Sequence, residues 1–320
     1  EVVYILTLTL RFHGMIRLEN LTKKYGEQKA VNDISFEIKT GEVVGFLGPN
    51  GAGKSTTMKI ITCFMAPSSG DVRLDSDSIH TDPEAIKRRI GYLPENNPLY
   101  LDMPVVEYLR FTAEIQGVSK SNIPGRIAEM IDRCGLDREK HKNINELSKG
   151  YRQRVGLAQA MIHDPEILIL DEPTTGLDPN QIVEIRKLIK DLGKEKTVIL
   201  SSHILSEVEA TCDRILIINR GRIVADGTSD TLRSQSQGQE LLKISIEAEP
   251  SEVEKAVRGL ASVEKVTAID GKKDWFHVQS KPDASSRKEV FDLCVKNKWY
   301  LMEMSGQETR LEDVFQKLTK

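Results

Sequence analysis

The chain has 320 residues, of which 39% are hydrophobic and 29% are charged, and its formal net charge is -3. This is an ordinary globular balance, and the length suits one large domain or one large and one small domain. The slightly negative charge argues against a broad nucleic-acid-binding surface, so no nucleic-acid partner is expected. The four cysteines are widely spaced without a Cys-x-x-Cys pair, which indicates neither a disulfide framework nor a zinc site and fits a reducing cytoplasm.

The first residues contain an apolar run, Val2 to Leu10, that is too short to span a bilayer and lacks the basic leading region of a signal peptide. Met15 directly precedes the first strand-like pattern, so we interpret residues 1–14 as a non-native or extra N-terminal leader. An additional edge strand is the alternative. No apolar run in the chain approaches the roughly 18 residues that span a membrane, so any membrane association is expected through a partner protein.

Residues 15–228 are predicted to form one large α/β domain. Apolar strands alternate with helices of amphipathic spacing, and this order predicts a mostly parallel sheet covered on both faces. The strands are expected at 16–18, 35–38, 43–47, 167–170, 197–201, 214–218 and 222–226, and the helices from 55 to 63, within 105–116 and 126–134, at 180–193 and up to 211.

The pattern changes after residue 228. Residues 229–239 are rich in Ser, Gln and Gly and are predicted to be a linker. Residues 240–320 then follow the order β-α-β-β-α-β, which predicts a small ferredoxin-like α+β accessory domain. Its strands are expected at 242–246, 263–269, 275–279 and 300–304, and its helices at 251–259, 285–297 and 311–318.

A glycine-rich loop follows the apolar strand at 43–47 and opens a helix. It matches the pattern G-x-x-x-x-G-K-[ST], whose glycines let backbone N–H groups and a helix N-terminus surround phosphates. In this pattern Lys54 contacts the β- and γ-phosphates of a nucleotide and Ser55 contacts Mg²⁺, while Thr56 is placed to help with the α-phosphate. The alternative is a plain glycine turn with an exposed lysine. The loop consists of Gly48, Pro49, Asn50, Gly51, Ala52, Gly53, Lys54 and Ser55.

Two carboxylates end the apolar strand at 167–170. Asp171 is expected to orient the Mg²⁺ shell, and Glu172, one step further, to take a proton from an attacking water. A solvated acidic turn is the alternative. Because the phosphate loop is present in the same chain, the pair favours nucleotide hydrolysis.

A second phosphate-binding helix start lies between these two motifs, at Leu147-Ser-Lys-Gly-Tyr-Arg-Gln. Ser148 suits an N-cap for a helix that runs from about Tyr151 through Met161. Such a helix start presents free N–H groups and a partial positive charge that can hold a γ-phosphate. A capped surface helix without this function is the alternative.

Six motifs in this order, over residues 15–228, resemble the ATP-binding-cassette (ABC) ATPases. The family's usual signature is Leu-Ser-Gly-Gly-Gln, from which Lys149 and Tyr151 depart while Ser148 and Gly150 are kept. The resemblance implies a P-loop core with an antiparallel β subdomain and a helical subdomain. It also implies that Ser148 and Gly150 reach the nucleotide of a partner subunit. Lys149 resembles the drug-exporter branch of the family.

Four further residues take roles from the resemblance. Tyr25 would stack on adenine, although a half-buried Tyr at a strand end is the alternative. Glu95, where the family usually has Gln, would sense Mg²⁺ and mark the loop that faces transport subunits, or it is a simple turn acid. Asp178 would link the two sites of a dimer, and it can equally cap the next helix with Pro179 at N1.

His203 is the last of these positions. It follows the strand at 197–201, at the carboxyl end where α/β proteins place their sites. In the family a His at this position bonds the γ-phosphate and positions the water. A purely structural His is the alternative.

The resemblance implies an ATPase that pairs head to tail around two ATP molecules, with itself or with a second ABC ATPase. Transmembrane permease subunits of an exporter-type complex would hold it at the cytoplasmic face of the membrane. Two runs, from Ile90 and from Leu147, resemble the gliding-motility-associated members of the family. One rival is an ATP-switched regulatory or structural protein without transport. A second is an accessory domain that binds a small ligand and regulates the ATPase.

Overall fold

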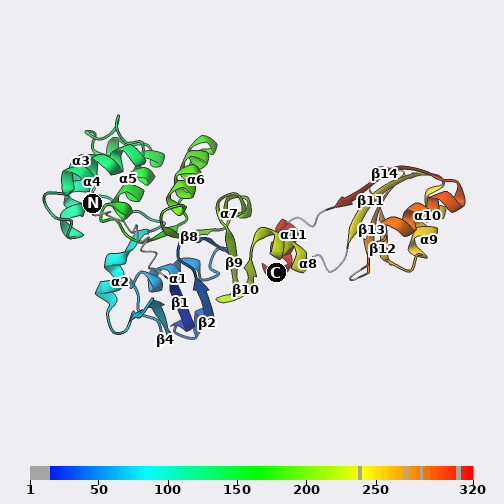
Figure 1. The fold of residues 1–320 in the computed structure, drawn as a ribbon, viewed down its shortest axis with the longest axis horizontal. Helices are drawn as coiled ribbons and strands as arrows, with labels where there is room; N and C mark the ends of the chain where they lie inside the picture. Colours follow the sequence, from blue (N-terminus) through cyan, green and yellow to red (C-terminus); the bar gives the residue numbers. More distant parts are fainter. Residues whose placement is uncertain are drawn as a thin grey trace, which may run out of the picture. The chain divides into compact units, whose positions relative to one another are not determined.

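The computed structural model describes residues 15–236, 240–269, 271–272, 274–281, 284–307 and 311–319. The predicted leader, 1–14, lies outside the described residues. The chain divides into two compact units, and the division falls between Thr228 and Ser229 (Figure 1). Each unit has its own sheets and its own hydrophobic core. None of the helices in the described ranges is long and apolar enough to cross a membrane.

The central sheet of the first unit has the strand order β10-β9-β3-β8-β7-β6. All neighbours are parallel except β9 and β10, which form an antiparallel hairpin. Every residue of β3, β7 and β8 is buried, because helices cover both faces of the sheet (Figure 1). The predicted mostly parallel core is confirmed. Its strands are β3 (Val43–Leu47), β6 (Ile90–Leu93), β7 (Ile167–Asp171), β8 (Thr197–Ser202), β9 (Arg214–Asn219) and β10 (Arg222–Gly227).

A second, antiparallel sheet has the order β2-β1-β4-β5. Its longest strands, β1 (Ile16–Tyr25) and β2 (Gln28–Ile38), extend well beyond the predicted 16–18 and 35–38. The difference arises because one face of this sheet is solvated, so polar residues continue each strand where an apolar pattern stops. The short strands are β4 (Ser69–Leu74) and β5 (Asp77–Ser78).

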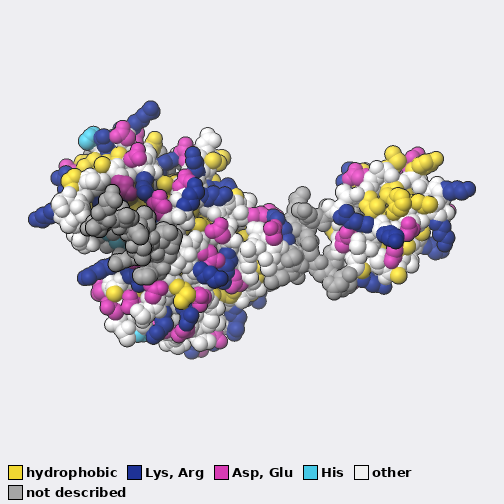
Figure 2. Space-filling view, viewed as in Figure 1, with side chains coloured by type: hydrophobic (Ala, Val, Ile, Leu, Met, Phe, Trp, Pro, Cys, Tyr) yellow, Lys and Arg dark blue, Asp and Glu magenta, His cyan; other side chains and the backbone are white. Residues whose placement is uncertain are grey.

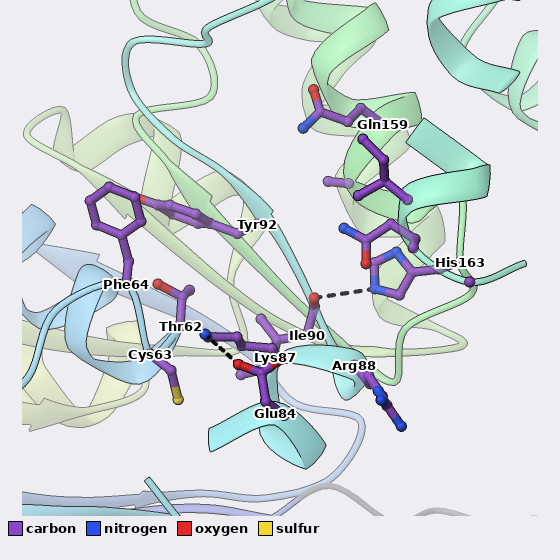
Figure 3. A pocket seen from close by; sticks show the side chains of 14 residues that line it. Thr62, Cys63, Phe64, Glu84, Lys87, Arg88, Ile90, Tyr92, Gln159 and His163 are labelled. Carbon is purple, nitrogen blue, oxygen red and sulfur yellow. Dashed lines mark hydrogen bonds and ion pairs between the residues drawn. The ribbon is translucent and has the colours of Figure 1, made fainter. Parts of the chain in front are cut away.

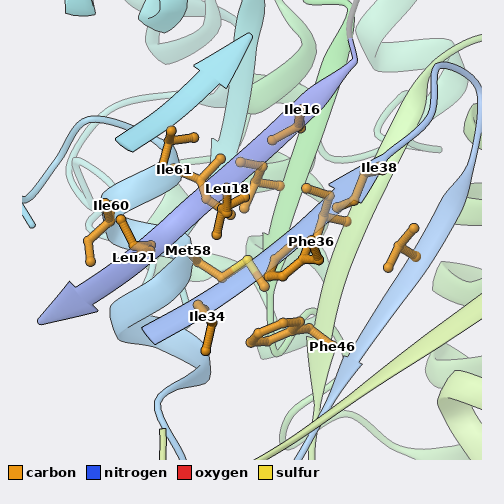
Figure 4. Close-up of a cluster of buried hydrophobic side chains, with 14 of the residues drawn as sticks. Ile16, Leu18, Leu21, Ile34, Phe36, Ile38, Phe46, Met58, Ile60 and Ile61 are labelled. Atoms are coloured by element: carbon orange, nitrogen blue, oxygen red, sulfur yellow. The ribbon is translucent and has the colours of Figure 1, made fainter. Parts of the chain in front are cut away.

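The first core lies between the antiparallel sheet, β3 and the helix α1 (Lys54–Ile61). Figure 4 shows the apolar side chains of β1 and β2 packed toward Phe46 and Met58, both fully buried. This packing fixes the direction in which α1 leaves the loop after β3. The hydrophobic core therefore positions the phosphate loop.

The other helices of this unit are amphipathic. Helices α3, α4 and α5 pack on one another as a helical subdomain, as the resemblance implied, while α6 and α7 pack near β8 and β3. These elements are α2 (Pro83–Arg89), α3 (Val105–Ile115), α4 (Ile123–Arg133), α5 (Lys149–Met161), α6 (Pro179–Gly193) and α7 (Leu205–Thr211).

The second unit begins with a helix inside the segment 229–239, which the sequence predicts to be a linker. Helix α8 (Ser229–Ser236) forms because Leu232 is buried and Asp230 pairs with Arg233 one turn later, at 3.4 Å. The segment 229–239 stays a predicted linker, and 237–239 lie outside the described residues. The polar composition of the segment did not predict the helix.

The remaining elements confirm the ferredoxin-like prediction. The sheet order is β12-β13-β11-β14, antiparallel throughout, and helices α9 and α10 pack against β12 and β14. The elements are β11 (Leu241–Glu247), α9 (Pro250–Arg258), β12 (Val263–Ala268), β13 (Trp275–Ser280), α10 (Arg287–Asn297), β14 (Tyr300–Gln307) and α11 (Leu311–Thr319).

Candidate active site

The predicted phosphate loop joins β3 to α1. Gly51 and Gly53 have φ values of 78° and 112°, which only glycine adopts readily. A side-chain carbon on Gly48 would lie 2.4 Å from the backbone oxygen of Ile218, and one on Gly53 would lie 2.4 Å from that of Ala30. Helix α1 begins without a side-chain cap, so its first N–H groups are available to an anion. The loop is thus a close-fitting backbone cradle.

Lys54 is buried at the start of α1, with only 6% of its surface exposed. Its Nζ donates to the backbone oxygens of Gly48 at 2.8 Å and Pro49 at 3.3 Å. It also lies 3.4 Å from Oε1 of Glu172. The ammonium is therefore held inside the loop, next to the acidic end of β7.

Asp171 ends β7 and is 1% exposed. Its Oδ1 accepts hydrogen bonds from the hydroxyls of Ser55 at 3.2 Å and Ser201 at 2.5 Å. Burial raises the pKa of the Asp171 carboxyl above its ordinary value, although the two hydroxyls and nearby Lys54 oppose this. The side-chain oxygens of Ser55 and Asp171 thus lie together at the mouth of the loop.

Ser201 is a site residue that sequence reasoning did not single out. It stands opposite Asp171 in the register of β7 and β8, and its Oγ also accepts the backbone N–H of Glu172 at 3.0 Å. It therefore fixes both carboxylate residues. The sequence feature that could have pointed to Ser201 is the serine pair that precedes His203 at the carboxyl end of a buried strand.

Glu172 has a φ of 50°, a left-handed conformation that is costly for a residue with a side chain. This turn sends the carboxylate back toward the loop. Oε2 accepts from the hydroxyl of Thr175 at 3.2 Å and lies 2.9 Å from Nδ1 of His203. The carboxylate is buried, whereas the His203 side chain is 41% exposed. Glu172 is therefore held between a buried ammonium and an imidazole that reaches solvent.

The signature turn forms the start of α5. Ser148 is its N-cap and accepts the Tyr151 N–H at 3.4 Å. The helix begins at Lys149, two residues before the predicted start at Tyr151. A side-chain carbon on Gly150 would lie 2.5 Å from the Gln181 side chain of α6. Gly150 therefore lies directly against the end of the Gln181 side chain, which is flexible and can move. In the described part of the chain, no hydrogen bond or ion pair joins Ser148 or Gly150 to the phosphate loop.

Asp178 caps α6, as the structural alternative predicted, by accepting the Gln181 N–H at 3.0 Å. Glu95 is exposed and shares the wall of a cavity of about 450 Å³ with Glu172, Thr175 and Lys149. The loop that carries Glu95 therefore lies beside both the acidic pair and the signature turn.

Tyr25 ends β1 and is 49% exposed, with its hydroxyl 3.0 Å from the sulfur of Met65. Thr56 is half-buried in the first turn of α1, directly after the loop. The fold therefore brings the phosphate loop, Asp171, Glu172 and His203 together.

The donor set fits a nucleotide and a hard divalent cation. The cradle offers N–H groups and one buried ammonium, which suit a phosphate chain. Among the described residues no cluster of three His, Cys, Asp or Glu side chains could hold a metal alone. Mg²⁺ is commonly held by one or two protein oxygens together with substrate phosphates, and Ser55 and Asp171 match that mode.

A phosphate cradle after a buried parallel strand, with a paired serine and aspartate and a poised glutamate, defines a P-loop ATPase. The model of the ABC transporter family matches residues 31–175. The linearmycin resistance ATP-binding protein LnrL of Bacillus subtilis is 34% identical over 314 residues, which cover 95% of this chain and 98% of that protein. The chain belongs to the ATP-binding subunits of ABC transporters and is an ATPase.

Two further comparisons agree. The bacitracin transport ATP-binding protein BcrA of Bacillus licheniformis is 40% identical over 225 residues, covering 70% of this chain and 72% of that protein. A dimeric ATP-binding cassette, solved in a post-hydrolysis state with ADP and Pi, has a TM-score of 0.61 and 28% identity. It covers 67% of this chain and 98% of that chain.

Proposed function

We propose that the chain drives an exporter-type membrane complex by pairing head to tail, with a second copy or another ABC ATPase, around two ATP molecules. The observation that carries the proposal is the position of Glu172, held between Lys54 and His203 at the mouth of the phosphate cradle. Two relatives named for antibiotic resistance and transport support the export role. Permease subunits would then hold the chain at the cytoplasmic face of the membrane.

In this proposal the residues of one chain bind the nucleotide and activate the attacking water. Loop N–H groups and Lys54 hold the β- and γ-phosphates, and Tyr25 stacks on adenine. Ser55 and Asp171 hold Mg²⁺, which supplies charge neutralisation on the phosphates when bound, and Glu95 senses it. Glu172 accepts a proton from the attacking water while His203 keeps its carboxylate oriented.

The partner chain completes the site. Ser148 is exposed at the start of α5, so the N–H groups of that turn can face the γ-phosphate bound by another copy. Asp178 caps α6, whose Gln181 lies against Gly150, and would link the two sites. Closure follows from the tighter binding of ATP to the paired state.

A cavity of about 920 Å³ in the first unit is the proposed permease contact. It lies between the ends of α1, α3 and α5 and the helix α2 (Figure 3). Phe64 and Ile115 at its edge are 73% and 65% exposed. Arg88 adds positive charge, whereas Lys87 is paired with Glu84 at 2.8 Å. An apolar segment of a transmembrane subunit with acidic flanks suits this surface.

The gliding-motility association is a narrower part of the proposal. It rests on the two sequence runs from Ile90 and from Leu147 alone, whereas the reported relatives are named for antibiotic resistance and transport. The permease that accompanies the chain decides between these roles.

Purification of the membrane complex tests the proposal. We expect transmembrane subunits to co-purify with the wild-type chain, and Phe64→Asp to abolish this without loss of ATP binding. Val183→Asp, which places the same charge at another exposed apolar site, should leave co-purification unchanged. If no membrane protein accompanies the active wild-type ATPase, the rival role of a regulatory cassette protein is favoured.

A further inference from the structure

Helices α9 and α10 pack on one face of the C-terminal sheet, and among the described residues no helix covers the other face (Figure 1). Strand alternation sends Ile244 of β11 and Phe276 of β13 into the core beneath α9 and α10. The neighbouring residues of these two strands therefore lie on the opposite face, where the strand register places Lys243 beside His277. Figure 2 shows hydrophobic and basic side chains side by side on the visible surface of this unit.

Trp275 is the aromatic centre of the helix-free face. The Nζ atoms of Lys243 and Lys272 lie 4.1 Å and 4.6 Å from its ring centroid. Both ammoniums are thus gathered around one indole, an attractive but weak arrangement at an exposed site. A single carboxylate, that of Glu303, lies 4.0 Å from Lys243.

The positive charge on this face is incompletely matched. Over the described ranges, no carboxylate lies within 4.0 Å of Lys265 or Lys272. Lys265 stands opposite Gln279, and Thr267 stands opposite His277, on the same side of the sheet. Of the three lysines, only Lys243 therefore has a carboxylate within 4.0 Å among the described residues, although strand alternation also places Glu247 on this face.

A cavity of about 410 Å³ occupies the same face. Its polar wall consists of Lys265, Thr267, His277 and Gln279, and its apolar wall includes Leu241 and Ile269. Pockets for small molecules measure about 300–1,000 Å³ and combine apolar walls with a few polar groups. The cavity has this size and this mixture.

We propose that the helix-free face binds a small organic anion that has an aromatic or apolar portion. The anionic group, a sulfonate, carboxylate or phosphate, contacts Lys265 and His277, and the apolar portion lies against Leu241 and Ile269 toward Trp275. The proposal rests on the apolar-walled cavity, on Lys265 in its wall without a carboxylate within 4.0 Å in the described ranges, and on the half-buried indole on the same face. The inference concerns the second unit and does not depend on the proposed transport function.

The test uses the full chain with ADP present, so that the nucleotide site is filled. The chain has two tryptophans, and Trp299 packs against the helix-covered core, so Trp299→Phe leaves Trp275 as the only reporter. The probe is 8-anilinonaphthalene-1-sulfonate, an aromatic anion. We expect saturable quenching of Trp275 emission, with probe emission on the wild-type chain giving the same affinity.

Matched variants and a matched probe decide the outcome. Lys265→Glu should weaken probe binding about tenfold, since one charged contact is lost, whereas Lys255→Glu, on the exposed side of α9, should change it less than about twofold. N-phenyl-1-naphthylamine, which lacks the sulfonate, should bind about tenfold more weakly. Equal affinities for the two variants or the two probes would overturn the proposal. So would displacement of the probe by a tighter-binding oligo(dT) strand, which would assign the face to single-stranded nucleic acid.

Discussion

Nδ1 of His203 lies 2.9 Å from Oε2 of Glu172, so an imidazole at the end of β8 orients the carboxylate at the end of β7. The same carboxylate lies 3.4 Å from Lys54 through its other oxygen. Each oxygen of Glu172 therefore has its own nitrogen partner. This arrangement leaves the carboxylate fixed in direction and available as a base.

Glu172→Gln should leave ATP binding intact and slow hydrolysis by on the order of 10²–10⁴, because an amide keeps the shape but does not accept the proton. Single-turnover ATPase rates and nucleotide affinity measure the two effects separately. Glu114→Gln, an exposed change on α3, is the control. Near-wild-type turnover in Glu172→Gln would exclude this residue as the base.

Ser148→Arg should block ATP-dependent pairing, because a long cationic side chain at the α5 start fills the space where a partner's phosphate would bind. Light scattering with ATP, in the slow Glu172→Gln background, measures the mass. Monomer ATP affinity should be unchanged. A variant that still forms the ATP dimer would contradict the shared-site model, and Ser119→Arg on another exposed turn should dimerise normally.

Ser201→Ala should lower both stability and turnover. The variant removes a donor to buried Asp171 and an acceptor for the Glu172 N–H, which costs about 1–3 kcal/mol when a buried group stays unpaired. Thermal unfolding and kcat are the measurements. Thr197→Val removes a buried hydroxyl at the opposite end of β8, where it accepts the Gly41 N–H. It should lower stability alone, and an equal loss of kcat in both variants would refute a site-specific role.

Asp171→Asn should leave the protein at least as stable without nucleotide, yet remove its stabilisation by Mg²⁺ and ATP. Burial raises the pKa of Asp171 in the folded protein. At pH values above the ordinary pKa of an aspartate, the buried ionised carboxylate therefore destabilises the fold. This loss of stability disappears as the pH falls below the ordinary pKa. Thermal unfolding at neutral pH in EDTA, and then with Mg²⁺ and ATP, tests both parts. A lower Tm for the variant in EDTA would show that the Asp171 charge stabilises the fold instead.

Local sequence patterns predicted most of the site. The phosphate loop is contiguous, and its glycines are needed for backbone conformations that a short stretch defines. Asp171 and Glu172 follow an apolar strand, so their place at a sheet edge was also predictable. Ser201 was missed because its role depends on its register with Asp171 across two strands that lie 30 residues apart in the chain.

The residues of the candidate site thus lie in short contiguous runs of the chain: a glycine-rich loop, an acidic strand end and a capped helix start. The packing of helices and strands determines which other residues these runs contact. The place of Glu172 between Lys54 and His203, the contact of Gly150 with Gln181 and the position of Lys243 over Trp275 each join elements that are distant in sequence. Side-chain contacts of this kind depend on strand register and helix packing, which form only when the whole core assembles.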